Sequence, residues 1–350
     1  MITAPAVSSP APAPINQIDA AKTRDILIRL RYLPLTVREY LGPKAHIHQN
    51  LQWDFSAPAI LRRLSARDPW SDPFNPWVMG ALYQFEAVHN LPILHGSDGI
   101  RGLPPVIVKA LLAAKKPDPD PWIWVLVSKF PRPETMRVFV AGHGWVYQSV
   151  CNTGVLHATP NGTWPIYARA LQTKMVGNFP IPVSNQTVHL YQAAVAAGYS
   201  VPPMPYQRYH HHWVQYQKYD DSDIRWVNYF YRGRALHFYP RAAYGFPQSA
   251  GCVELPRAAA KHLYTLLHYG VPVSIIHRLP AQGLQNSTVA SQSTYVYREI
   301  PVHSSTQSVQ LRLVHVSALH TPTPSGTPKP ITPPPPGIAS VGSPDPDPAA

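Results

Sequence analysis

The sequence has little of several features that would narrow its class. Two cysteines among 350 residues are too few for a disulfide framework. Charged residues make up 14% of the chain and no long basic run occurs, so nucleic-acid binding is the weaker interpretation. No apolar run approaches the length of a membrane span. The N-terminus lacks the charged and apolar regions of a signal peptide, so the chain is either cytoplasmic or has lost a leader.

Proline, in contrast, is abundant: its 42 residues concentrate at the two ends and in connectors. We expect residues 1–16 to be a disordered Pro/Ala linker and residues 321–350 a disordered Pro-rich tail. The run Lys115-Lys-Pro-Asp-Pro-Asp-Pro predicts a stiff linker at 115–121 between two domains. Lys and Arg outnumber Asp and Glu by 30 to 18, which favours an anionic partner: nucleic acid, a membrane or an acidic cell-wall polymer.

Residues 17–114 carry apolar side chains at helical spacing and predict a small helical bundle. The expected helices span residues 23–33, 59–64, 76–90 and 103–114, and Ser97-Asp-Gly-Ile-Arg-Gly predicts a turn before the last of them.

Beyond the linker, at residues 122–280, the period of the apolar pattern changes to two. The expected strands span residues 122–128, 137–140, 145–151, 224–231, 234–238 and 270–276, with a helix at 256–269. The polar, histidine-rich segment 206–223 is expected to be a surface loop or an insertion near the site, and residues 281–320 an extra hairpin. The fold class predicted for the chain is α+β, a helical bundle plus a mostly antiparallel β-sandwich or barrel.

Cys252 is the candidate nucleophile of the chain. It ends the small-residue turn Ser249-Ala-Gly-Cys, and His237 lies 15 residues upstream. A thiol on such a turn with a histidine within reach is what a cysteine nucleophile and its base require. Cys151 ends an apolar strand and is interpreted as a buried core residue.

The triplet His210-His-His is interpreted as solvent-exposed rather than as a metal site. Three adjacent histidines cannot all face one ion from one strand, and no cysteine or carboxylate at ligand spacing accompanies them. We expect neither a metal nor a cofactor.

Four motifs follow one another in the second domain. They are Asn152-Thr-Gly with Thr159-Pro-Asn-Gly-Thr-Trp, Tyr229-Phe-Tyr-Arg-Gly-Arg-Ala-Leu-His, Gly245-Phe-Pro-Gln-Ser-Ala-Gly-Cys-Val-Glu-Leu, and Gly270-Val-Pro-Val-Ser-Ile. In order and spacing this set resembles the catalytic domain of the L,D-transpeptidases, the YkuD-like family. The N-terminal block resembles a peptidoglycan-binding-like helical domain through Leu27-Ile-Arg-Leu-Arg-Tyr-Leu-Pro, Gly80-Ala-Leu-Tyr-Gln-Phe-Glu-Ala-Val-His-Asn-Leu and Asp98-Gly-Ile-Arg-Gly.

The resemblance implies roles for the residues of the nucleophile segment. Cys252 would attack the carbonyl after the third residue of a peptidoglycan stem tetrapeptide, with His237 as its base. Backbone amides at Gly251 and Cys252 would form the oxyanion hole, and Ser249 and Gly251 would shape the turn. The aromatic residues Tyr239, Tyr244 and Trp213 either line a sugar or peptide groove or belong to the β core.

The resemblance also implies a function and a cellular location. The protein would be an extracytoplasmic enzyme that cross-links the cell wall, with peptidoglycan stem peptides and glycan as partners. Two residues depart from the family pattern: Ala250 replaces a histidine and Glu254 an arginine. Because Glu254 brings a negative charge near the thiol, we expect it to raise the pKa of Cys252. A catalytically weakened peptidoglycan-binding protein and an L,D-carboxypeptidase are the alternatives.

Overall fold

A computed structural model of the chain describes residues 18–41, 47–93, 103–118, 120–284, 296–299 and 311–314. It confirms a mixed α+β fold. The N-terminal elements are α1 (Ala20–Arg29), β1 (Leu35–Leu41), β2 (Ile47–Trp53), α2 (Ala59–Ser65), α3 (Pro76–Val88) and α4 (Pro105–Ala113). The elements that follow are β3 (Ile123–Phe130), β4 (Thr135–Val140), β5 (Gly144–Val150), η3 (Val155–His157), β6 (Gly162–Pro165), β7 (Ala168–Val183), α5 (Asn185–Ala196), β8 (Tyr206–Tyr209), β9 (His212–Tyr231), β10 (Arg234–Phe238), β11 (Val253–Leu255), α6 (Arg257–Leu266) and β12 (Pro272–Arg278).

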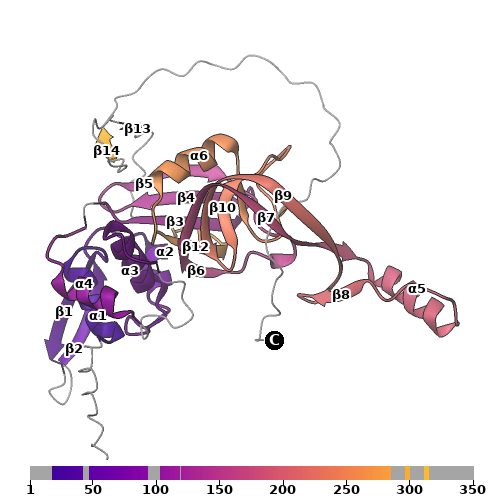
Figure 1. Ribbon diagram of the computed structural model, residues 1–350, viewed down its shortest axis with the longest axis horizontal. Helices are drawn as coiled ribbons and strands as arrows, with labels where there is room; N and C mark the ends of the chain where they lie inside the picture. The colour runs from indigo at the N-terminus through magenta and orange to yellow at the C-terminus, as the bar shows by residue number, and fades with distance from the viewer. Residues whose placement is uncertain are drawn as a thin grey trace, which may run out of the picture.

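The second domain is built from two open sheets rather than a closed barrel (Figure 1). One sheet has the order β5-β4-β3-β12-β6, and the other the order β11-β10-β9-β7 with β8 paired to β9. Most pairs are antiparallel, as expected, but β12 runs parallel to β3 and β11 runs parallel to β10.

Strand β3 is buried on both faces and separates two apolar cores. Ile123, Val125 and Val127 pack with β10, β11, β12 and α6 in the core of the second domain. Trp124 and Leu126, on the other face, belong to the core that the N-terminal helices form. The alternation follows from the period of two along a strand. The expected inward face of the helix after Cys252 is confirmed, because Leu263, Leu266 and Leu267 are all buried.

The N-terminal block is less purely helical than the sequence indicated. Its four helices lie close to the expected ranges, but β1 and β2 pair as an antiparallel hairpin between α1 and α2. Helix α3 is capped at its N-terminus by Asn75, whose side chain accepts hydrogen bonds from the amides of Trp77 and Val78 at 3.0 and 3.1 Å. The turn predicted at 97–102 lies outside the described residues.

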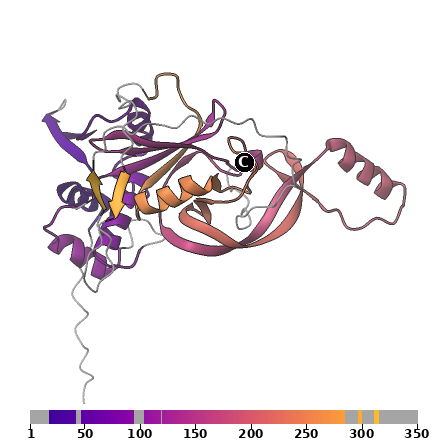
Figure 2. The ribbon, with the colours of Figure 1, turned by 90° about the horizontal axis from the view of Figure 1, so that it is seen from above.

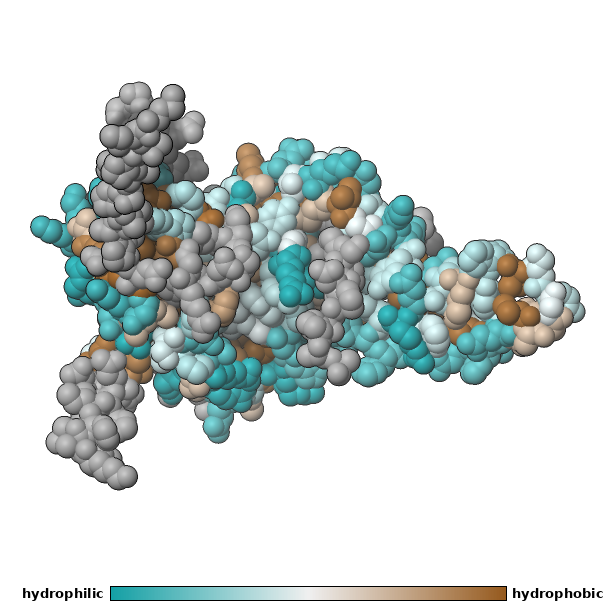
Figure 3. All heavy atoms as spheres, turned by 60° about the horizontal axis from the view of Figure 1, so that its bottom comes forward, coloured by the Kyte–Doolittle hydropathy of each residue, from teal (hydrophilic) through white to brown (hydrophobic). Residues whose placement is uncertain are grey.

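Of the two alternatives expected at 206–223, the surface loop is wrong. These residues form β8 and most of β9, which pairs with β7 as a long two-stranded ribbon that ends at α5. Figure 2 shows this arm curving away from the body of the sheets, and Figure 3 shows apolar surface near its tip. There Leu190 and Val195 of α5 are 65% and 50% exposed.

The expected tails at 1–16 and 321–350 lie outside the described residues. Within 281–320, β13 (Val296–Glu299) and β14 (Leu311–Val314) pair antiparallel, as the expected hairpin requires. None of the helices in the described ranges has the length and apolar character that crossing a membrane takes.

Candidate active site

Cys252 and His237 lie on the same face of the sheet that β10 and β11 form. The two strands pair in parallel, with Leu236 beside Val253 and His237 beside Glu254. Leu236 and Val253 point into the core of the second domain, so Cys252 and His237 point to the opposite face. Strand rise and strand spacing put the Cα atoms of Cys252 and His237 about 8 Å apart, within reach of their side chains.

His237 is held in the tautomer that a general base needs. Its Nδ1 lies 2.9 Å from the carbonyl oxygen of Phe238, and a carbonyl can only accept, so Nδ1 carries the proton. Nε2 is therefore the unprotonated nitrogen. It is buried and has no hydrogen-bond partner among the described residues. Burial lowers the pKa of His237, although the nearby Glu254 carboxylate raises it, so the neutral imidazole is favoured.

The Cys252 thiol is fully buried in this structure. It packs in a small cluster with Ala235 and Ala250, which Met175 of β7 and Tyr219 of β9 also join. Burial raises the pKa of the thiol to about 12. The Ala235 amide, whose nitrogen lies 3.4 Å from Sγ, lowers it again. The arm thus contributes side chains to the cluster that holds the thiol, and the raised pKa favours the neutral thiol.

The charged neighbours of the thiol shift its pKa in opposite directions. Glu254 raises the pKa of Cys252, as the sequence predicted, although burial is the larger cause. The Arg234 guanidinium lowers it. Arg234 is 9% exposed and its Nε donates to the carbonyl oxygen of Ala158 at 2.8 Å. Sequence reasoning missed this buried cation, although it lies within the quoted motif that ends at His237.

Ser249 and Gly251 form the turn before Cys252, but the Gly251 amide is already bonded. It donates to Ser249 Oγ at 3.0 Å, and Ser249 Oγ donates to the Cys252 carbonyl oxygen at 2.7 Å. The turn therefore closes on itself, and a free Gly251 amide for an oxyanion is not present in this arrangement. Gly251 has a φ of 145°, and a Cβ there would lie 2.9 Å from Arg234 Nε, so only glycine fits.

Hydrogen bonds from the Asn152-Thr-Gly and Thr159 motifs hold this turn in place. Thr159 Oγ1 accepts from the Gly154 amide and donates to the Gly251 carbonyl oxygen, both at 2.7 Å. Buried Glu134 accepts from the amide and the hydroxyl of Thr153 at 2.6 and 2.9 Å. The sequence singled out these motifs for their order, and in the structure their hydrogen bonds fix the backbone of the turn before Cys252.

Glu254 does not face the thiol as a lone charge. Its carboxylate accepts two hydrogen bonds from Arg241, at 2.8 Å from Nε and 2.9 Å from Nη2. The exposed fractions of the two side chains are 0% for Glu254 and 8% for Arg241. The family's arginine is thus replaced by a carboxylate that carries its own buried arginine, 13 residues upstream in the chain.

The three aromatic candidates are not equally placed. Tyr239 packs against the cluster that holds Cys252, and Arg241 lies over its ring at 4.7 Å. Tyr244 donates from its hydroxyl to the Tyr239 carbonyl oxygen at 2.5 Å. Trp213 lies at the start of β9, beside Val183 and under Arg208, outside that cluster.

Of the remaining candidates, Cys151 lies in the core, and His210 and His211 lie at the surface. Cys151 is buried in the core of the second domain, and both cysteines are free thiols. His210 and His211 form the turn between β8 and β9 with φ values of 43° and 65°, and both are exposed. Among the described residues, no group of three His, Cys, Asp or Glu side chains has an arrangement that would hold a metal ion.

Comparison with known proteins gives the class of the second domain. Residues 123–275 match the family model of the YkuD L,D-transpeptidase catalytic domain. This match confirms the family resemblance of the second domain, whereas that of residues 17–114 to a peptidoglycan-binding-like domain stays a prediction. No curated protein matches the chain.

Solved structures of L,D-transpeptidases are similar to part of the chain. One from Mycobacterium smegmatis is 18% identical, with 44% of this chain and 59% of that chain covered and a TM-score of 0.28. L,D-transpeptidase 3 from Mycobacterium tuberculosis is 19% identical, with 45% and 62% covered and a TM-score of 0.30. The catalytic domain of the E. faecium L,D-transpeptidase is 14% identical, with 44% and 95% covered and a TM-score of 0.30. The chain thus spans less than two thirds of either mycobacterial protein.

Proposed function

We propose that this protein is a peptidoglycan L,D-transpeptidase whose nucleophile is Cys252 and whose general base is His237. The observation that carries the proposal is the unpartnered, unprotonated Nε2 of His237 on the same sheet face as the Cys252 thiol. A buried nitrogen without a partner costs stability, and a proton-accepting role beside a thiol accounts for it. The substrates would be cell-wall stem peptides, which also implies that the protein works outside the cytoplasm.

In the acylation step the thiol proton moves to His237 Nε2 and the sulfur attacks the carbonyl carbon after the third stem residue. The C–N bond to the terminal D-residue then breaks, and His237 returns the proton to the leaving amine. The product is a thioester on Cys252.

In the second step an amine of another stem attacks the thioester carbonyl and loses its proton to His237. The C–S bond breaks, the proton goes back to sulfur, and a new amide cross-link remains. Water in place of the amine gives a trimmed stem and an L,D-carboxypeptidase.

The electrostatic support for the thiolate comes from Arg234 and the Ala235 amide, because both lower the pKa of Cys252. Ala250 leaves no imidazole beside the thiol, and Arg234 is the buried cation that compensates. The Glu254 charge opposes this effect, but Arg241 neutralises it across two hydrogen bonds.

The test is incubation of the full chain with tetrapeptide muropeptides, followed by mass spectrometry of the products. We expect cross-linked products from the parent and from Cys151→Ala, which truncates the other buried thiol, and none from Cys252→Ala. A carbapenem should add covalently to Cys252.

Because neutral His237 is the base and burial lowers its pKa, the acylation rate should fall only at pH values below the ordinary histidine range near 6.5. His237→Gln should slow acylation by about 10²-fold or more and remove this acid limb.

Each other outcome has a meaning. Trimmed stems without cross-links would assign the L,D-carboxypeptidase reaction. No product, no carbapenem adduct, and undiminished binding of Cys252→Ala to sacculi would reject the enzyme in favour of a wall-binding protein.

A further inference from the structure

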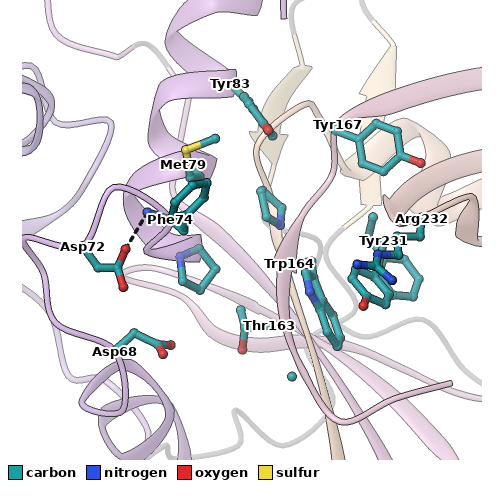
Figure 4. Close-up of a pocket in the computed structure, with 14 residues that line it drawn as sticks. Asp68, Asp72, Phe74, Met79, Tyr83, Thr163, Trp164, Tyr167, Tyr231 and Arg232 are labelled. Carbon is teal, nitrogen blue, oxygen red and sulfur yellow. Dashed lines mark hydrogen bonds between the residues drawn. The ribbon is translucent and has the colours of Figure 1, made fainter. Parts of the chain in front are cut away.

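A pocket separate from the thiol lies between the N-terminal block and the second domain. Its volume is about 770 Å³, which is in the range of small-molecule sites. One wall comes from α3 and the segment before it, and the other from β6 and the end of β9 (Figure 4). Neither domain forms this pocket alone.

The wall from the second domain presents aromatic faces. The ring of Trp164 stacks on that of Tyr231, with centroids 4.3 Å apart and planes inclined by 28°. The position of the indole depends on Gly162, because a Cβ there would lie 2.4 Å from the Trp164 ring. Tyr83 of α3 lines the pocket from the opposite wall. Such surfaces accept the flat apolar faces of a ring-shaped ligand.

The charged side chains at this pocket belong to opposite walls. Asp68 and Asp72 lie on the N-terminal side and Arg232 on the β9 side (Figure 4). One Asp72 oxygen accepts from the Phe74 amide at 2.8 Å. The Asp68 carbonyl oxygen accepts from Asn75 Nδ2 at 3.3 Å, whereas the described residues offer the Asp68 carboxylate no hydrogen bond or ion pair. Carboxylates accept hydrogen bonds from hydroxyl groups, and a guanidinium donates to hydroxyl or carbonyl oxygens. A ligand with apolar ring faces and a polar rim of hydroxyl and amide groups meets both requirements.

The pocket connects directly to the strand that supports the thiol. Tyr167 lines it, and the Tyr167 hydroxyl accepts a hydrogen bond from the Gly233 amide at 3.0 Å. Two residues later the Ala235 amide lies 3.4 Å from Cys252 Sγ. A ligand in the pocket therefore lies against the same turn that leads to the nucleophile.

We propose that this pocket binds the sugar rings of a glycan strand and so holds the strand whose stem peptide reaches Cys252. The inference rests on the proposed function for the identity of the glycan, whereas the pocket itself stands on its own geometry. The N-terminal block would contribute to glycan binding through this shared site rather than through a surface of its own.

The test is calorimetric titration of the full chain with a tetramer of N-acetylglucosamine, which carries no peptide. We expect the parent to bind and Trp164→Ala to bind about tenfold or more weakly, because a stacking face is lost. Asp68→Asn and Arg232→Asn should each weaken binding several-fold. Both side chains are exposed, and asparagine tolerates the φ of 42° at position 232, so these variants keep the fold. Tyr199→Ala, at a tyrosine that is 71% exposed, is the matched control and should bind like the parent.

The outcomes separate this inference from the proposed function, since carbapenem acylation of the parent is measured alongside. If Cys252 is acylated but the tetramer does not bind, or binds equally to every variant, the glycan pocket is wrong and the enzyme stands. If the tetramer binds in a Trp164-dependent way but Cys252 never reacts, the enzyme is wrong and the pocket stands. A sugar-free stem tetrapeptide that binds with the same dependence on Trp164 would also overturn the glycan assignment.

Discussion

At the scale of single residues, Glu254 stands where the family pattern has an arginine, and it forms a buried ion pair with Arg241. Both side chains are almost fully removed from water, and two hydrogen bonds of 2.8 and 2.9 Å join them. Arg241 also donates to the Gln248 carbonyl oxygen, and so ties the loop before the nucleophile turn to β11. Breaking such a pair leaves an uncompensated buried charge, which costs far more than the pair contributes.

We predict that Arg241→Met lowers the free energy of unfolding by about 3–5 kcal/mol, because Glu254 then stays buried without its partner. The measurement is urea denaturation followed by tryptophan fluorescence. Arg225→Met is the control: it breaks the Arg225–Asp223 pair, whose side chains are 42% and 60% exposed, and should cost about 1 kcal/mol or less. Equal losses in the two variants would show that Glu254 is not buried as described.

The sequence predicted a candidate pair, Cys252 and His237, but not the surroundings of that pair. Cys252 and His237 could be found because they belong to motifs of fixed spacing. Arg241 and Ser249 could not be assigned partners, since their contacts depend on how the loop between β10 and β11 folds. The expectation of a free Gly251 amide failed for the same reason: the competing acceptor is a hydroxyl two residues away, Ser249 Oγ.

At the scale of elements, the arm of β7, α5, β8 and β9 is the part that the sequence pattern hid. Much of β9 between His212 and Asp223 is exposed on both faces, so the alternation that marks a half-buried strand is missing. The strands β3, β4 and β12 were found because their apolar residues cover at least one buried face. A two-stranded ribbon in solvent has no such signature.

The arm contributes Met175 and Tyr219 to the apolar cluster that holds Cys252. Met175 of β7 is 6% exposed in the cluster that holds Cys252, whereas its neighbour Val176 is 53% exposed on the other face of the strand. We predict that Met175→Ala increases the rate of Cys252 alkylation by iodoacetamide several-fold, because it removes part of the cover over the sulfur. The modified fraction at Cys252 is measured by peptide mass spectrometry.

Val176→Ala is the matched control, since it truncates a side chain one residue away that points to solvent. Its alkylation rate should equal that of the parent. If both variants react at the parent rate, the arm does not limit access, and the thiol must be reached from another side.

At the scale of the whole molecule, the N-terminal block and the second domain share one core. Trp53 of β2 packs against Trp122 with ring centroids 4.7 Å apart and planes inclined by 46°, and Trp77 of α3 lies beside Trp124 of β3. The linker expected at 115–121 therefore connects two units that are packed together rather than held apart. The pocket between the domains depends on this packing.

Helix α3 lies close against the second domain at Gly80. A Cβ on Gly80 would lie 2.4 Å from the carbonyl oxygen of Gly270, a backbone atom that cannot turn aside. Helix propensity alone would make Gly80→Ala stabilising by about 0.5–1 kcal/mol. Because the added methyl group pushes α3 away from the segment before β12, we predict instead a loss of about 1–3 kcal/mol in urea denaturation.

The same substitution should weaken binding of the N-acetylglucosamine tetramer, since Met79 and Tyr83 of α3 line the pocket. Cys252 lies on elements of the other sheet, so its acylation by a carbapenem should change less than sugar binding does. The sign of the stability change is the decisive observation. A gain in the free energy of unfolding would mean that α3 does not rest on Gly270, and that the two domains form no common pocket.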